Sequence, residues 1–182
     1  MDENQVEQHE KWMTKALELA KSALDAGEFP VGCVLVSGDR IVGMGSRLNS
    51  HGKHQNELDH AEIVALRQWA ESGRPGDGEV VVYSTLEPCL MCTGALLISG
   101  IRHIVFAYED VMGGACGLDF SKRISASANS KSFTSLYTEA DPKVVAGVMR
   151  QESLNLFKAF FSRPDNSYLK NTLLEQYTLE QA

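Results

Sequence analysis

Apolar residues recur at intervals of three and four along residues 12–26, and this spacing predicts an amphipathic helix that ends at Gly27. The next apolar run, PVGCVLV at residues 30–36, predicts a buried strand. RIVGMG at residues 40–45 predicts the strand that returns from it. The SGD between the two runs has the composition of a tight turn, so we expect a β-hairpin.

After the hairpin the pattern alternates between helices and strands. Residues 60–72 and 89–99 have helical spacing, and glycines follow both segments. Residues 79–86 and 101–108 are rich in β-branched residues, which is typical of strands. A crossover helix joins parallel strands, so this order predicts an α/β fold whose strands are parallel after the hairpin.

Two polar stretches interrupt this pattern. Residues 46–59 lack any apolar period and predict a long surface loop, of a length that is often functional. Residues 110–132 are rich in Gly, Ser and Ala and predict a second stretch that is mostly loop. SFTSLYT at residues 132–138 is the candidate for a short last strand.

The C-terminal part predicts one further long helix. Residues 141–161 have amphipathic spacing, with Asp141 placed to act as N-cap and Pro142 at the first helical position. The polar residues 163–182 then predict either a second short helix or a loose tail.

Length and composition are those of one globular domain. The chain has 182 residues, of which 43% are hydrophobic and 23% charged, and we expect a single domain over residues 1–182 with its core in about residues 10–162. No apolar run approaches the roughly 18 residues of a membrane span, and the polar start lacks a signal-peptide core. These features predict a cytoplasmic protein.

The net charge of -7 argues against broad, nonspecific binding to nucleic-acid phosphates, but it allows a local basic patch.

The segment EPCLMCT at residues 87–93 contains Cys89 and Cys92. Taken alone, such a pair could be a disulfide, a redox couple, half of a zinc site or two core thiols. A reducing compartment disfavours the disulfide. At the start of a predicted helix both sulfurs share one face, and the helix N-terminus favours the thiolate that binds metal. We expect Cys33 and Cys116 to be buried free thiols.

Possible partners for this pair lie in DHAEI, at residues 59–63. His60 and Glu62 are two positions apart, so they cannot share one face of a helix. Both can lean toward a point in front of the helix N-terminus, where His60 could bind an ion and Glu62 could hold a water. Three protein ligands plus a water is the arrangement of a catalytic zinc site.

HAE followed by PCLMC resembles the cytidine and deoxycytidylate deaminase superfamily. Together with PVGCVLV, HAEIVALR, TLEPCLMC and GGACG, these motifs are most similar to tRNA adenosine deaminases and the related guanine and cytosine deaminases. The resemblance implies a three-layer α/β/α fold, with helices on both faces of a mixed five-stranded sheet. It also implies one Zn²⁺ per chain, held by His60, Cys89 and Cys92, and hydrolytic removal of an exocyclic amine with Glu62 transferring the proton.

The resemblance further implies substrate contacts and a homodimer. Asn49 lies eleven residues before His60, where these deaminases often carry an asparagine that binds substrate, although the GSRLNS segment is longer here. The remaining implied positions surround the base or the sugar: Phe29, Pro30, Val31, the backbone of Ala61, and Asp110.

Three functions follow as hypotheses. The first is deamination of a free nucleobase or nucleoside, and the second is deamination of the wobble adenosine of tRNA. The stretch from Pro164 onward contains a single basic residue, Lys170, which slightly favours the small substrate. The third is a non-catalytic, zinc-stabilised partner subunit. Such partners often lack the catalytic glutamate, whereas Glu62 is present here.

Overall fold

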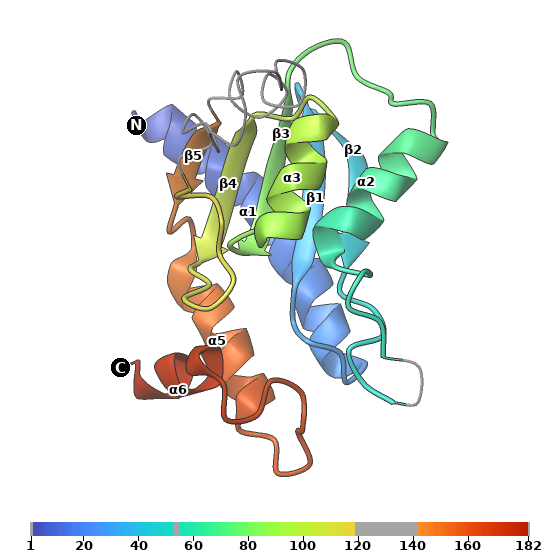
Figure 1. Ribbon diagram of the computed structural model, residues 1–182. Helices are drawn as coiled ribbons and strands as arrows, with labels where there is room; N and C mark the ends of the chain where they lie inside the picture. Colours follow the sequence, from blue (N-terminus) through green and yellow to red (C-terminus); the bar gives the residue numbers. More distant parts are fainter. Residues whose placement is uncertain (1, 53–54, 119–141, 182) are drawn as a thin grey trace, which may run out of the picture.

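A mixed five-stranded sheet forms the centre of the computed structural model, which describes residues 2–52, 55–118 and 142–181 (Figure 1). The strand order is β2-β1-β3-β4-β5. β1 is antiparallel to β2 and β3, whereas β3, β4 and β5 are parallel. The predicted hairpin and the parallel strands after it are therefore confirmed. The strands are β1 (Gly32–Ser37), β2 (Arg40–Ser46), β3 (Val80–Leu86), β4 (His103–Tyr108) and β5 (Lys143–Ala146).

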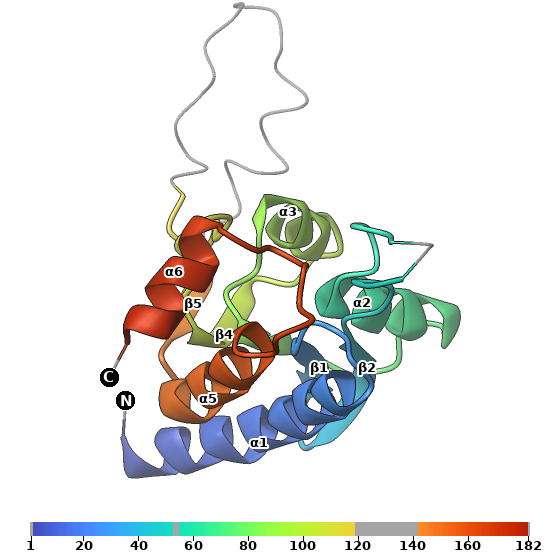
Figure 2. The same ribbon diagram turned by 90° about the horizontal axis from the view of Figure 1, so that it is seen from below.

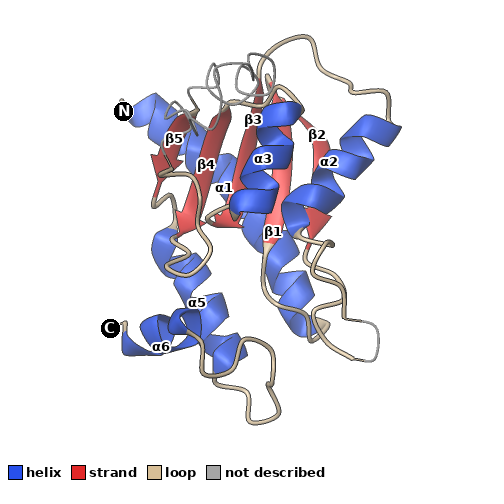
Figure 3. Cartoon of the chain, in the orientation of Figure 1, coloured by secondary structure: helices blue, strands red, loops and turns tan. Residues whose placement is uncertain are grey.

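Helices cover both faces of this sheet, which confirms the three-layer α/β/α arrangement (Figures 2 and 3). α1 (Glu3–Asp25) and α5 (Arg150–Phe161) lie on one face, and α2 (Ala61–Glu71) and α3 (Leu90–Ile98) lie on the other. α6 (Leu173–Glu180) packs against α5, so the end of the chain forms the short helix and not the loose tail. No helix within the described ranges is long and apolar enough to cross a membrane.

Strand β1 is buried at all six positions because helices lie on both of its sides. Val34 and Val36 belong to the cluster around Trp12 and Met13 of α1. The alternate residues of the strand, Cys33 and Leu35, belong to the larger cluster that includes Ala65 and Trp69 of α2. The continuous apolar run PVGCVLV thus reflects burial on two faces.

Helix α1 begins nine residues before the predicted start at Trp12. The side chain of Asp2 accepts from the backbone N–H of Gln5, and the Gln5 side chain accepts from the backbone N–H of Asp2. This capping box stabilises a polar first part of the helix. Apolar spacing could not reveal it, because these turns lie outside the core.

The prediction of one helix over residues 141–161 is wrong in its first part. Lys143–Ala146 form β5, which pairs in parallel with β4, and the helix begins only at Arg150. Gly147 has a φ of 82° and Met149 a φ of 54°, so the backbone between strand and helix is left-handed at two positions. Pro142 therefore precedes a strand, while Asp141 and the candidate strand 132–138 lie outside the described residues.

Gly45 brings α2 unusually close to β2. A Cβ built there would lie 2.4 Å from the carbonyl oxygen of Ala61 and 2.6 Å from the backbone nitrogen of Ala65. Only glycine leaves room for this approach. The contact sets the position of the N-terminus of α2, and with it the side chains of His60 and Glu62.

Candidate metal centre and substrate cavity

Two helix N-termini meet on the same side of the sheet. His60 is the N-cap residue of α2, and Cys89 is the N-cap residue of α3. Cys92 follows in the first turn of α3, where it is buried. Helix N-termini favour anionic groups, so this placement stabilises thiolates.

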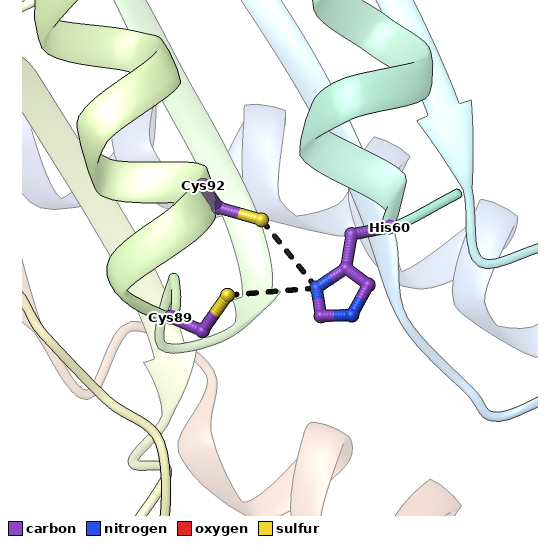
Figure 4. Close-up of side chains that lie close together, drawn as sticks. All are labelled: His60, Cys89 and Cys92. Carbon is purple, nitrogen blue, oxygen red and sulfur yellow. Dashed lines mark hydrogen bonds between the residues drawn. The ribbon is translucent and has the colours of Figure 1, made fainter. Parts of the chain in front are cut away.

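The three side chains converge on one point (Figure 4). Nδ1 of His60 lies 3.4 Å from Sγ of Cys92 and 3.7 Å from Sγ of Cys89. The three possible ligand atoms all lie within 4.8 Å of one another. Because zinc binds imidazole nitrogen at about 2.0 Å and thiolate sulfur at about 2.3 Å, one ion fits between them. Two soft thiolates and an imidazole are ligands that zinc prefers.

The thiols of Cys89 and Cys92 differ in pKa. A hydrogen bond with Cys92 lowers the pKa of Cys89 to about 4, and the His60 side chain acts in the same direction. The same hydrogen bond and burial raise the pKa of Cys92. The pKa of His60 is raised, chiefly by its hydrogen bond with Cys89. Zinc binding to both sulfurs would therefore displace the proton of the Cys92 thiol.

Glu62 lies beside this cluster, in the first turn of α2. Its side chain is only 3% exposed, and burial raises its pKa. The Ser84 hydroxyl of β3 donates to Oε1 at 2.8 Å, and the Cys92 thiol donates to Oε2 at 3.4 Å. A buried carboxyl group with a raised pKa, fixed by hydrogen bonds, is suited to accept and return a proton.

A cavity of about 180 Å³ lies beside this cluster, and His60, Glu62 and Cys89 form part of its lining. Its wall is mostly apolar, which suits a flat ring system, and it carries a few charged groups. The lining residues are Phe29, Val31, Arg47, Glu57, His60, Ala61, Glu62, Leu86, Glu87, Cys89, Asp110, Met112, Gly113, Tyr168, Leu169 and Leu174.

A family model for the cytidine and deoxycytidylate deaminase zinc-binding region matches residues 6–108. The chain belongs to this deaminase family. The family's zinc cofactor agrees with the His60, Cys89 and Cys92 cluster, and the first residues of the match fall in α1. The matched region ends with β4, so it contains the whole cluster and Glu62.

The sequence similarity to relatives of this deaminase covers nearly the whole chain. The tRNA-specific adenosine deaminase of Haemophilus influenzae is 36% identical over 169 residues, which cover 91% of each chain. tRNA-specific adenosine deaminase 2 of Xenopus laevis is 32% identical over 164 residues, covering 86% of this chain and 88% of the relative. A solved structure from work on A-to-I editing by tRNA:A34 deaminases superposes with a TM-score of 0.63 at 28% identity, covering 80% of this chain and 98% of that one.

The fold is also shared with more distant deaminase-like structures. A protein solved with 8-azaguanine superposes with a TM-score of 0.62 at 24% identity, covering 84% of both chains. At this identity the likeness concerns the fold alone.

Four of the substrate-contact residues expected from the sequence line the cavity of this deaminase, namely Phe29, Val31, Ala61 and Asp110. Pro30 and Asn49 are not among the lining residues. The Asn49 side chain instead donates to Oδ2 of Asp59 at 2.9 Å. Its left-handed backbone, with a φ of 56°, turns the chain into the following loop.

Asp110 also stabilises the loop that follows β4 through hydrogen bonds. Its Oδ1 accepts from the backbone N–H groups of Met112 and Gly113, each at 2.9 Å. Glu87 accepts from the backbone N–H groups of Asp110 and Cys116, and burial raises its pKa. These bonds hold the loop after β4 against the metal cluster, where it forms one side of the cavity.

Several lining residues were not expected from the sequence. Arg47 and Glu57 come from the polar stretch after β2, and Tyr168, Leu169 and Leu174 come from the C-terminal segment. A lone arginine in a polar run carries no signal that it is buried, yet Arg47 is only 2% exposed. The C-terminal residues lie far from the motifs in sequence, and only the fold brings them to the cavity.

Proposed function

We propose that the chain is a zinc-dependent hydrolytic deaminase that removes the exocyclic amine of a nucleobase or nucleoside. The observation that carries this proposal is the buried Glu62, which lies beside the His60, Cys89 and Cys92 cluster and lines the same cavity. A metal-ligand set next to a protected acid/base group is what hydrolysis of an amidine requires.

In the proposed reaction His60, Cys89 and Cys92 hold the zinc, and Glu62 moves the proton. Zinc, when bound, lowers the pKa of water to about 7 in catalytic sites of this kind. Glu62 accepts one proton from the attacking water and delivers it to the ring nitrogen, and it then passes the proton of the newly attached hydroxyl group to the leaving amine. The C–O bond forms before the C–N bond breaks, and the products are a carbonyl base and ammonia. The apolar walls exclude bulk water, and Ser84 keeps the Glu62 carboxyl group in place.

The surroundings of the cavity favour a free base or nucleoside as the substrate. Its volume of about 180 Å³ lies below the range of roughly 300–1,000 Å³ for drug-sized ligands, so it suits one base. Among the described lining residues Arg47 is the one lysine or arginine, whereas Glu57, Glu87 and Asp110 are acidic. Acidic groups in the cavity lining disfavour a phosphate backbone.

The wobble adenosine of tRNA is the second candidate, and the names of the relatives support it. A substrate panel separates the two candidates: ammonia release from guanine, adenine, cytosine and their nucleosides, beside inosine formation in an anticodon stem-loop. Turnover of the small substrates supports the first proposal. Turnover of the stem-loop alone replaces it with the second, and turnover of none, by a zinc-loaded chain, supports the partner-subunit hypothesis.

We also propose a cytoplasmic homodimer that forms through α3. Leu90 and Ile98 are 59% and 60% exposed, and with Gly94 they follow each other at four-residue intervals on one face of that helix. A second copy would cover this apolar stripe. Light scattering should show a dimer for the wild type and a monomer for Leu90→Glu; a monomeric wild type contradicts the proposal.

A further inference from the structure

The C-terminal segment forms one wall of the cavity. Tyr168 and Leu169 lie between α5 and α6, Leu174 lies in the first turn of α6, and all three line the cavity. Leu169 and Asn171 have positive φ values of 55° and 62°. This left-handed conformation is common for asparagine but uncommon for leucine, so contacts around Leu169 must hold it.

The helix at the end of this segment is firmly attached to the rest of the protein. The hydroxyl groups of Tyr108 and Thr178 are 3.1 Å apart and buried, and the Tyr177 hydroxyl donates to Glu109 at 2.6 Å. Arg150 of α5 donates to the Gln181 side chain at 3.2 Å. Because α5 and α6 are both fixed, the eleven residues between them are held at two ends.

Tyr168 joins this segment to the polar stretch after β2. Its hydroxyl donates to Oε2 of Glu57 at 2.8 Å and accepts from Nη2 of Arg47 at 3.2 Å. Nη2 of Arg47 also donates to Oε2 of Glu57 at 3.0 Å, which closes a triangle of three side chains. The Tyr168 ring packs against Phe29, with ring centroids 5.4 Å apart. All four residues line the cavity.

Loss of the hydrogen bonds between Arg47, Glu57 and Tyr168 would destabilise the protein, because the Arg47 guanidinium group is buried. Its Nη1 donates to the carbonyl oxygens of Leu48 and Asn56, and its Nε has no hydrogen-bond partner among the described residues. A buried guanidinium group that already has one unpaired donor loses further stability when another acceptor is removed. Tyr168 therefore holds the wall in two ways, through its hydrogen bond with the buried Arg47 guanidinium group and through the packing of its ring.

We propose that Tyr168 is a specificity-determining residue, which through Glu57 and Arg47 holds the C-terminal segment as a closed wall of the substrate cavity. This inference rests on the proposed function and extends it to the size of the substrate. On this proposal, a nucleoside can enter the cavity beside the C-terminal segment. A polynucleotide strand that carries the same base would collide with that segment. Opening the wall should therefore relax discrimination against the longer substrate.

The test compares one base in two substrates, the nucleoside that the panel identifies and a trinucleotide that carries the same base. The wild type should turn over the nucleoside with the higher kcat/KM. Tyr168→Ala should lower the ratio of the two kcat/KM values by about tenfold or more, mainly by raising KM for the nucleoside. Tyr168→Phe keeps the ring but loses both hydrogen bonds, and it should shift the ratio in the same direction by a smaller factor.

Tyr83→Phe is the matched control. It removes a tyrosine hydroxyl that lies 3.0 Å from Nδ1 of His9, but Tyr83 belongs to β3 and, within the part of the chain that the structure describes, does not line the cavity and makes no contact that holds the C-terminal wall. This variant should keep the wild-type ratio even where its stability falls. Wild-type ratios in folded Tyr168→Phe and Tyr168→Ala, or in Tyr168→Phe alone where the alanine variant fails to fold, would overturn the inference. A wild type that prefers the trinucleotide would also overturn it and leave the deaminase proposal intact, whereas loss of activity on every substrate would concern the proposed function.

Discussion

Substitution of Gly45 by alanine tests how the fold positions the metal cluster. The added Cβ would lie 2.4 Å from the carbonyl oxygen of Ala61 and 2.6 Å from the nitrogen of Ala65, whereas ordinary contacts are 3.4–4 Å. Both are backbone atoms of α2, which cannot rotate away as a side chain can. The helix would therefore have to move away from β2 by about 1 Å, a shift that overpacked cores resist.

The expected cost of Gly45→Ala is about 2–3 kcal/mol of the free energy of unfolding, at the upper end of overpacking effects. Zinc affinity should fall as well, because His60 moves with α2 while Cys89 and Cys92 remain on α3. Metal–ligand distances tolerate only about 0.2 Å. We expect a loss of zinc affinity of about 10- to 100-fold, the range seen when ligand orientation is disturbed.

Two glycine variants serve as controls, with urea unfolding and competition against a chelator as the assays. A Cβ at Gly78, which lies between α2 and β3, has no neighbour within 4 Å, so Gly78→Ala should gain about 0.4–1 kcal/mol in the free energy of unfolding and keep its zinc. A Cβ at Gly32 would lie 2.1 Å from the carbonyl oxygen of Ala16 in α1, so Gly32→Ala should unfold more easily without moving α2. Wild-type stability and zinc affinity in Gly45→Ala would refute this reasoning.

Three further predictions concern separate parts of the molecule. Burial alone would raise the pKa of Glu109, but hydrogen bonds from Arg150 and Tyr177 lower it to about 2. This stabilisation is complete above the unfolded pKa of 4.5 and is lost as the pH falls toward 2, so Arg150→Met should reduce stability in urea titrations at pH 7 and much less at pH 2. Phe157 is fully buried, and Phe157→Ala should lower the free energy of unfolding by about 3–5 kcal/mol, which thermal unfolding can measure. Cys92→Ser should lose most of the bound zinc in elemental analysis, whereas a variant at Cys33, which lies outside the cluster, should keep it.

The sequence was most informative where chemistry and periodicity coincide. HAE and PCLMC each contain residues needed for one metal site, and each begins a helix whose apolar spacing is clear. Both helices start on the same side of the sheet, so the motifs meet in space. The strands β1, β3 and β4 were equally predictable because they are mostly buried apolar runs, and the tight turn after β1 indicated β2.

Edge elements and long-range contacts were harder to predict. β5 is a four-residue edge strand, three of whose residues are exposed, so its short KVVA run fitted a helix as well as a strand. Arg47 and Tyr168 are 121 positions apart, and no local pattern indicates that they meet. The metal cluster was therefore visible in the sequence, whereas the cavity wall depends on how the ends of the chain pack.

The most direct test of the central claim measures bound zinc and ammonia release together in the wild type and in Glu62→Gln. The glutamine keeps the shape of the side chain but cannot transfer the proton, and it leaves His60, Cys89 and Cys92 unchanged. We predict equal zinc contents, one ion per chain, and a rate of ammonia release from the confirmed substrate that is lower by about 10²–10⁴-fold. A Glu62→Gln variant that retains zinc and full activity, or a reduced native protein that binds no zinc, would contradict the account.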